Sequence, residues 1–315
     1  MTQSPILTLT LNPALDMATE VHEMTPGHKL RCTEPQLDPG GGGLNVSRAI
    51  KALGGDSLAL VAIGGLTGDR LAGLIRGEGV TFLSILGPGE TRQSLTVNEA
   101  TTGKQYRFML PGPVWGEAER SRVFTLLRAT ARPGGISVIS GSQPPGVPVD
   151  FPAQLAAAMS GMEVVLDTSG KALHEAVERP IPGLRLLRMD GEEAEALAGR
   201  RLLTREETAD FAQSLVAARV AQQVIVARGA DGSVLAEAAL RLHAVAPKVT
   251  VVSKVGAGDS FVGAFILALA REQGPEAALS HGVCAAAAAV MTEATDLCRA
   301  EDVARLVKGC EVRRV

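Results

Sequence analysis

Short apolar runs recur along the chain, and each run ends in glycine, serine, aspartate or asparagine. The apolar residues are consecutive rather than alternating, which is the pattern of strands buried on both faces of a parallel sheet. The clearest runs are residues 6–13, 58–65, 137–142, 164–170 and 224–229. Each one predicts a strand whose carboxyl end opens into a polar or glycine-rich turn.

Segments rich in alanine and leucine, with the spacing of amphipathic helices, lie between these strands. Examples are residues 45–55, 151–161, 192–200 and 299–309. The alternation of strands and helices predicts an α/β fold with a doubly wound, mostly parallel sheet. Because ligands of such sheets bind beyond the carboxyl ends of the strands, we expect the functional site at that edge.

Two segments break the alternation, residues 14–37 and 91–110. Both alternate apolar and polar positions around turns at "TPGH" and "TTGK", which predicts hairpins. Two hairpins alone are marginally stable, so we expect a small β lid over the ligand edge, with its apolar face covered by a second subunit. An ordinary surface β-meander is the alternative. The main α/β domain would then comprise residues 1–13, 38–90 and 111–315.

Composition limits the classes of partner. The 315 residues carry a formal net charge of -3 and no basic stripe, which excludes the usual footprint of nucleic-acid binding. No apolar run reaches the ~18 residues of a membrane span, and the first residues do not read as a secretory signal. The four cysteines lack C-x-x-C spacing, which favours free thiols. We therefore expect a cytoplasmic protein without a nucleic-acid or membrane partner.

Glycine-rich turns are the strongest candidate chemistry. They occupy residues 39–45, 64–69, 140–146, 227–232 and 255–260. A single such turn is weak evidence, but several after the strands of one sheet indicate a ligand edge. The last of them, "VGAGDS", is neither the dinucleotide fingerprint nor the Walker pattern. A hydride-transfer enzyme and a P-loop NTPase therefore lose support.

The "VGAGDS" turn nevertheless has the features of an anion site. The backbone N–H groups of Gly256, Ala257 and Gly258 would face a ligand at the start of a helix. For this stretch alone, Asp259 or Ser260 capping that helix is the simpler explanation. A site for phosphoryl transfer also needs a base for the proton of the attacking hydroxyl, and Asp259 would supply it.

With these motifs the chain resembles the ribokinase-like (PfkB) sugar kinase family, and within it the 6-phosphofructokinase branch. The motifs are "TLNPALD", "KLRC", "PGGGGLNVSRAIKALGG", "TRQ", "QYRFMLPG", "SGSQPPG", "DTSG" and "VGAGDS". The resemblance implies a doubly wound domain with a β lid that pairs between two subunits. It also implies transfer of the γ-phosphate of MgATP to a phosphosugar. The expected enzyme is a 6-phosphofructokinase, with 1-phosphofructokinase and tagatose-6-phosphate kinase as alternatives.

The resemblance assigns residues to the sugar side of the site. Asp16 would hold sugar hydroxyls, the tetraglycine with Asn45 would approach the sugar, and cations of the lid with a serine would bind the acceptor's phosphate. The set is Asp16, Lys29, Gly40, Gly41, Gly42, Gly43, Asn45, Arg92, Arg107 and Ser142. A turn aspartate, a flexible helix start and charged edge strands are the plain alternatives. Four consecutive glycines cost much chain entropy, which favours the functional interpretation.

On the nucleotide side the resemblance is partial. Gly229 and Gly232 match the family's S-x-G-x-x-G turn, whereas Ala227 replaces its serine or threonine. Glu193 matches a glutamate that organises Mg²⁺ through water, but Arg188 and Asp190 replace a lysine and an asparagine. The pair Asp190 and Glu193 also fits a helix capping box. Val255 would lie beside the nucleotide as well.

The segment 292–296 also departs from the family. Thr292, Ala294 and Asp296 stand where relatives carry asparagine, glycine and arginine around adenine and a monovalent cation. These departures count against potassium activation. Together with the changes at Arg188, Asp190 and Ala227, they motivate a rival function, a sugar-phosphate or nucleotide sensor with weak turnover.

Overall fold

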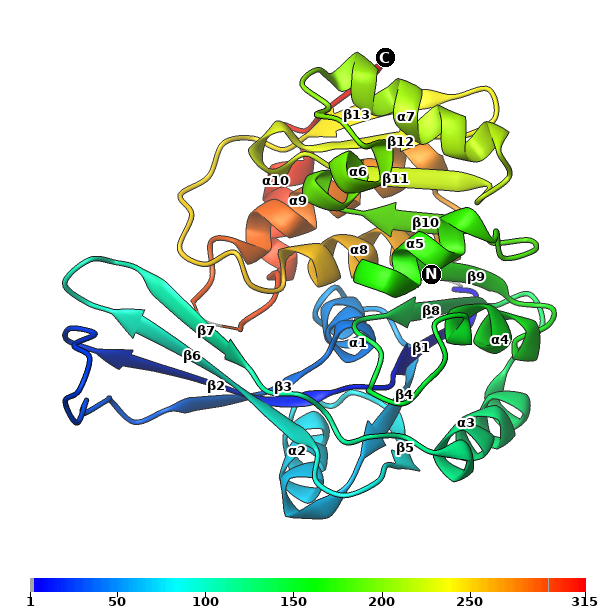
Figure 1. The fold of residues 1–315 in the computed structure, drawn as a ribbon. Coiled ribbons are helices and arrows are strands. Elements are labelled where there is room, and N and C mark those ends of the chain that lie inside the picture. Colours follow the sequence, from blue (N-terminus) through cyan, green and yellow to red (C-terminus); the bar gives the residue numbers. More distant parts are fainter. Residues whose placement is uncertain (1–2, 294) are drawn as a thin grey trace.

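The computed structural model describes residues 3–293 and 295–315, and a ten-stranded sheet forms its centre (Figure 1). In spatial order the strands are β14 (Glu311–Arg314), β13 (Arg241–Val245), β12 (Ser233–Ala236), β11 (Gln223–Ala227), β10 (Leu186–Met189), β9 (Glu163–Asp167), β8 (Ile136–Ser140), β1 (Ile6–Thr10), β4 (Leu58–Ile63) and β5 (Phe82–Leu86). All pairs from β11 to β5 are parallel, and β12 to β14 add antiparallel neighbours. This confirms the predicted fold class.

Helices cover both faces of this sheet. Along β1, Ile6 packs into one hydrophobic cluster while Leu7 and Leu9 pack into the other, since successive side chains of a strand point to opposite faces. The first cluster includes residues of α1 (Gly42–Ala52), α8 (Ala257–Ala270), α9 (Gly274–Ala289) and α10 (Ala300–Val307). The second includes residues of α3 (Glu117–Thr130), α4 (Phe151–Ala158), α5 (Gly170–Glu178), α6 (Gly191–Ala198) and α7 (Arg205–Ala217). Burial on both faces explains the continuous apolar runs.

The sequence patterns missed the shorter or less buried strands. β5 is an edge strand with exposed Leu83 and Leu86, and β10 carries the charged Arg188 in its middle. The antiparallel strands β12 to β14 were not predicted either. A further helix, α2 (Gly65–Gly77), packs on β4 through a small cluster that includes Leu71 and Ile75. None of the helices in the described part of the chain has the length and hydrophobicity that a bilayer span requires.

The two predicted hairpins form a separate four-stranded sheet, which we call the lid (Figure 1). Its strand order is β3 (Gln36–Gly40), β2 (Ala14–Val21), β6 (Arg92–Glu99) and β7 (Gln105–Met109). The outer pairs are antiparallel, but the central pair, β2 with β6, is parallel. A meander has only sequential antiparallel neighbours, so that alternative is wrong. The predicted boundary between the lid and the main domain, at residue 38, falls inside β3, which leads directly into α1.

The root of the lid is tied to the main domain by buried groups. Leu15 in β2 is 3% exposed, and the carboxylate of Asp38 in β3 accepts hydrogen bonds from the Thr295 hydroxyl and from Gln36 Nε2. The opposite end of the lid is a loop of residues 22–35, which extends away from the main domain in Figure 1. The lid is therefore fixed at its base and free at its tip.

Only some of the glycine turns follow strands of the main sheet. Those after β4, β8 and β11 do, but the turn at 39–45 follows the lid strand β3, and the turn at 255–260 follows a long loop after β13. The prediction of five equivalent turns was wrong for these two. Both lead into helices, α1 and α8, that begin at the same edge. A Cβ at Gly42 would lie 2.5 Å from Ser140 Oγ, so the start of α1 lies directly on the end of β8.

A core substitution tests the packing between α8 and the sheet. Phe265 is fully buried and stacks on Phe261, with ring centroids 5.9 Å apart. Phe265→Ala should lower the free energy of unfolding by about 3 to 5 kcal/mol, because it leaves a cavity in a close-packed core. Leu66→Ala, at a side chain 81% exposed, is the control and should change it by less than about 0.5 kcal/mol. Equal effects in urea denaturation would contradict this packing.

Candidate active site

The first turn of α8 is open toward the carboxyl edge of the sheet. Its N-cap is Gly256, with φ 75°, and no described side chain caps the helix. The capping alternative for Asp259 and Ser260 is therefore wrong. Asp259 Oδ2 accepts a hydrogen bond from Asn45 Nδ2 at 2.9 Å, and Ser260 Oγ accepts one from the backbone N–H of Cys298 at 3.3 Å. The first N–H groups of the helix remain available to an anion.

Asp259 is a buried carboxyl with an unusual titration. Burial raises its pKa from 3.8 to about 6, and the negative charge of Asp167 adds to the rise. The hydrogen bond from Asn45 and the charges of Arg188 and Arg48 act in the opposite direction. A group that titrates near neutral pH can both accept and release a proton under ordinary conditions.

Arg188 lies beside this turn, among carboxylates. Its Nη1 is 3.2 Å from Asp167 Oδ1, and Asp167 Oδ2 accepts a hydrogen bond from Ser140 Oγ at 2.9 Å. A Cβ at Gly258 would lie 3.1 Å from Arg188 Nη2, so the guanidinium lies against the α8 turn. The nearby charges of Asp167, Asp259 and Glu193 raise the pKa of Arg188 against the effect of its burial. This cation can therefore share an anion with the helix N-terminus.

The sequence analysis did not assign a role to Asp167. It is the last residue of β9 and directly follows the buried run Val164 to Leu166. A polar residue at the carboxyl end of a central parallel strand is a usable signal for a site residue. That signal was available in the "VVLDTSG" run.

On the lid side, Asp16 faces a cluster of polar groups. It lies in β2 and accepts a hydrogen bond from the Ser94 hydroxyl of β6. Burial raises the pKa of Asp16, while the Ser94 bond and the charges of Arg92, Arg48 and Arg107 lower it. A Cβ on Gly40 would overlap the Asp16 carboxylate, so the tetraglycine begins in direct contact with this acid. The structure thus brings Asp16 and the start of the tetraglycine together.

Arg92 and Ser142 also come together, through a residue that the sequence analysis missed. Arg92 Nε donates to the carbonyl of Asn12 at 3.1 Å, and its Nη1 donates to the carbonyl of Leu110 at 3.3 Å. Asn12 Nδ2 in turn donates to Ser142 Oγ at 3.1 Å. A guanidinium and a hydroxyl held close in this way are suited to a phosphate group.

Lys29 does not join this group within one chain. It lies in the exposed loop at the tip of the lid, whereas Arg92 lies at the root. The register pairs Ala14 with Arg92 and Val21 with Glu99, so the length of β2, about 20 Å, separates the two ends. Arg107 is exposed on β7, opposite Thr96, and close enough to Asp16 to influence its charge.

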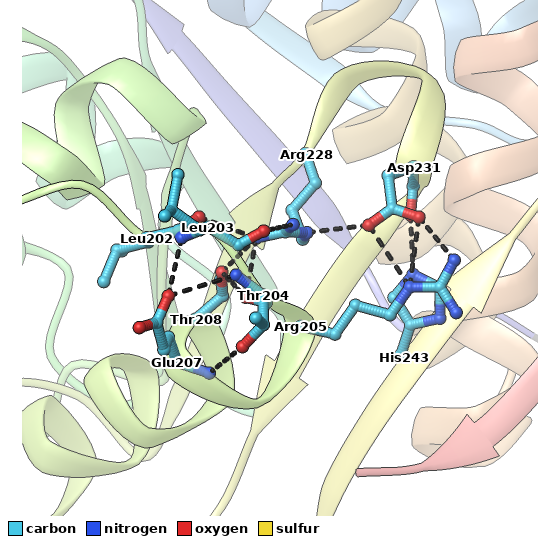
Figure 2. A network of polar contacts seen from close by, with 9 residues as sticks. All are labelled: Leu202, Leu203, Thr204, Arg205, Glu207, Thr208, Arg228, Asp231 and His243. Carbon is cyan, nitrogen blue, oxygen red and sulfur yellow. Dashed lines mark hydrogen bonds and ion pairs between the residues drawn. The ribbon is translucent and has the colours of Figure 1, made fainter.

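The predicted nucleotide turn, Ala227 to Gly232, is held by side chains around it (Figure 2). Arg228 donates to the carbonyls of Leu203 and Thr204 at 3.1 and 2.9 Å, and its Nε donates to Asp231 at 2.9 Å. Asp231 also pairs with Arg205 of α7. The pKa of Asp231 falls to about 2, chiefly because of the hydrogen bond from Arg205. Only glycine fits at Gly232, since φ is 83° and a Cβ would overlap the Ala244 carbonyl.

The segment containing Arg188, Asp190 and Glu193 lies next to this turn, since a Cβ at Gly191 would be 3.2 Å from the Ala227 carbonyl. Asp190 and Glu193 form the capping box of α6, with both hydrogen bonds at 2.8 Å. This confirms the structural alternative for the pair, and it occupies only one oxygen of each carboxylate.

The residues around Glu193 suit a divalent cation held through water rather than by direct ligands. In the described part of the chain there is no group of three side chains arranged to hold a metal. Burial raises the pKa of Glu193, and the charges of Asp190 and Asp167 raise it further. A dication would relieve that repulsion, and Mg²⁺ bound to phosphates keeps most of its waters.

Local hydrogen bonds hold the chain around Thr292. The Thr292 hydroxyl donates to the carbonyls of Ala289 and Asp296 at 2.7 and 2.9 Å. The Val255 N–H donates to Ser253 Oγ at 3.2 Å in the loop before α8. Ala294, the remaining departure noted in this segment, lies outside the described residues.

Comparisons with known proteins identify the family of this chain. A family model described as pfkB family carbohydrate kinase matches residues 9–302. The ATP-dependent 6-phosphofructokinase isozyme 2 of Mycobacterium tuberculosis H37Rv is 40% identical over 304 residues, 95% of this chain and 88% of the relative. The protein of the same name from Escherichia coli K12 is 39% identical, with 96% and 97% covered.

A solved structure supports the same assignment. The phosphofructokinase-2 of Escherichia coli in complex with potassium superposes with a TM-score of 0.92 at 37% identity, over 97% of this chain and 99% of that one. The family model spans nearly the whole chain and includes the lid, the tetraglycine and the α8 turn. The chain therefore belongs to the pfkB family of carbohydrate kinases.

Proposed function

We propose that this kinase is an ATP-dependent 6-phosphofructokinase, which converts fructose 6-phosphate and ATP to fructose 1,6-bisphosphate and ADP. The observation that carries the proposal is the buried Asp259 carboxyl, which lies at the open start of α8 and bonds Asn45. The names of the relatives at 39% and 40% identity support the choice of substrate.

The sugar would lie between the lid and the start of α1. Arg92 and Ser142, which both contact Asn12, would bind the 6-phosphate. Asp16 would accept hydrogen bonds from sugar hydroxyls, and the backbone at Gly41 with the Asn45 amide would place the reacting end near Asp259. A sugar without a phosphate would offer no anionic group to the Arg92 guanidinium.

Asp259 would accept the proton of the 1-hydroxyl as that oxygen attacks the γ-phosphorus in line. The bond from the γ-phosphorus to the bridging oxygen breaks, and ADP leaves with the electron pair. The first N–H groups of α8, from Gly256 to Asp259, and the Arg188 guanidinium would stabilise the charge on the transferring group. One such donor is worth about 3 to 4 kcal/mol in well-studied anion holes.

Mg²⁺ would be held through water by Glu193, with Asp190 nearby, and would neutralise charge on the nucleotide phosphates. The turn from Ala227 to Gly232 would contact those phosphates through its backbone. Arg228 and Asp231 hold the shape of this turn without a hydroxyl at position 227.

Asp259→Asn tests the assignment of the base. ADP release with fructose 6-phosphate should fall by about 10² to 10⁴-fold, because the proton of the attacking hydroxyl loses its acceptor. In the wild type, kcat should fall below about pH 6, where Asp259 becomes protonated.

The same assay over a panel of phosphosugars separates the alternatives. Preference for fructose 1-phosphate or tagatose 6-phosphate would point to the sister activities. Binding without turnover in the wild type would favour the sensor. Turnover that survives Asp259→Asn would exclude Asp259 as the base.

The raised pKa of Asp259 also predicts a pH dependence of stability. Because the folded state holds the proton more tightly than the unfolded state, stability falls as pH rises from about 4 to 6, by about 3 kcal/mol. Asp259→Asn should therefore raise the unfolding free energy by about that amount at pH 8 and by little at pH 4. Asp231→Asn is the contrast, since its lowered pKa means that the mutation should destabilise the fold at neutral pH. Chemical denaturation at several pH values measures both.

We also propose a homodimer formed through the lid. Phe108 and Met109 of β7 are 47% and 53% exposed, and Leu30 in the tip loop is 37% exposed, so the lid presents apolar surface to solvent. Lys29 lies at the tip, far from Arg92 of its own chain. Pairing of two lids would let Lys29 reach the acceptor's phosphate in the partner's site.

Mixing two inactive variants tests this arrangement. Asp259→Asn and Lys29→Ala should each be impaired, and their mixed dimer would contain one site with both side chains intact. Unfolding and refolding a mixture should restore about a quarter of wild-type activity, since half of random dimers are mixed. Mixing with no recovery, or sedimentation as a stable monomer at micromolar concentration, would contradict the proposal.

A further inference from the structure

One buried cation near the site has no role in the function proposed above. Arg48 of α1 is 8% exposed, and its guanidinium lies between the lid, the start of α1 and the end of α2. We infer that Arg48 is a positioning residue that holds the Asn45 amide with its NH2 group toward the base, Asp259. The inference rests on the proposed role of Asp259.

Arg48 makes hydrogen bonds with three different groups. Its Nε and Nη2 donate to Glu78 at 2.6 and 2.7 Å, a two-point ion pair that fixes the plane of the guanidinium. Its Nη1 then donates to Asn45 Oδ1 at 3.1 Å and to the carbonyl of Pro39 at 2.9 Å. Glu78 therefore aims the remaining donor at the residue next to the base.

The chemistry of these groups decides which way the amide points. A guanidinium only donates hydrogen bonds, so the amide atom that faces Arg48 must be the oxygen. The NH2 group then faces Asp259, where Nδ2 is 2.9 Å from Oδ2. Without Arg48, the amide could turn over and present its oxygen to the carboxylate. Asn45 alone does not choose between these two orientations.

The orientation has consequences for the base. The charged groups that act on Asp259 are Asp167 from β9, Arg188 from β10 and Arg48 from α1. The Asn45 bond and the Arg48 charge both favour the carboxylate over the carboxylic acid. Loss of Arg48 removes both effects, and the pKa of Asp259 rises above its wild-type value of about 6.

Arg48 also reaches the sugar side. The Pro39 carbonyl that it binds immediately precedes Gly40, which lies against Asp16. The same guanidinium thus holds the start of the tetraglycine and the amide beside the base. A change at Arg48 should affect both KM for the sugar and the pH profile of kcat.

The test compares the pH profile of kcat in the wild type, Arg48→Lys and Arg48→Met. In Arg48→Met the acid limb should move up by about one pH unit, so that activity falls about fivefold at pH 6 but much less at pH 8. Arg48→Lys keeps the positive charge but loses the paired donors of the guanidinium, and it should shift the acid limb less. Asn45→Ala should shift the limb as well, and adding Arg48→Met to it should shift the limb further only by the smaller effect of the Arg48 charge.

Glu78→Gln is the matched control, because it removes the negative charge of the ion pair but keeps a side-chain oxygen that accepts a hydrogen bond from Arg48, which stays beside Asn45. It should lower stability without moving the acid limb. If Arg48→Met lowers stability and leaves the limb in place, Arg48 is only structural and the inference is overturned.

A readout independent of turnover separates this inference from the proposed function. In denaturation, the difference in unfolding free energy between each background and its Asp259→Asn partner reports the titration of Asp259. In the Arg48→Met background, this difference in unfolding free energy should extend to higher pH. If Arg48→Met does not fold, Arg48→Lys takes its place. An unchanged range overturns the inference. A wild type without turnover would overturn the kinase assignment and leave this measurement interpretable.

Discussion

The burial of one carboxylate is the constraint on which the rest of the site depends. Asp259 lies at the start of α8 and its only described hydrogen-bond donor in a side chain is Asn45, 214 residues away in sequence. A buried carboxylate is costly unless it is paired or hydrogen-bonded. The ends of α1 and α8 therefore have to meet, and α1 can reach that position only because Gly42 packs directly on Ser140 and Gly141. The close approach of the α1 backbone to the end of β8 therefore also places Asn45 beside the Asp259 carboxylate.

Burial raises the pKa of Asp259 toward neutral pH, and the surrounding charges act on it in both directions. Asp167 repels it and Arg188 attracts it, while these two groups pair with each other at 3.2 Å. Gly258 leaves the guanidinium room against the helix turn. A phosphoryl group at this turn would meet the helix N-terminus and Arg188 together, so positive charge lies where negative charge would develop during transfer.

The two ends of the lid carry different candidate functional residues. Its root carries Asp16, Ser94 and Arg92 and is fixed by the buried Asp38 against Thr295. Its tip carries Lys29 and the exposed Leu30, whereas the exposed Phe108 and Met109 of β7 pair with Leu95 and Ser94 nearer the root. The parallel pairing of β2 with β6 joins hairpins that are separated by a complete β-α-β segment, so the sugar side of the site depends on contacts between segments distant in sequence.

The sequence by itself determined the alternation of strands and helices, the two hairpins and the "VGAGDS" turn. These are local features, because apolar periodicity and glycine turns are written in neighbouring residues. Whether Asp259 capped its helix or faced a ligand depended on Asn45, and the tertiary structure decided it.

The tertiary structure also decided the roles of Asn12, Asp167 and Arg48, and it separated Lys29 from Arg92. Asn12 meets Ser142 across 130 residues of sequence, and Arg48 meets Glu78 across 30. Arg48 has an unremarkable local pattern, since an arginine inside an amphipathic helix reads as a surface residue. Its function comes from a partner that only the folding of distant segments brings within hydrogen-bonding distance.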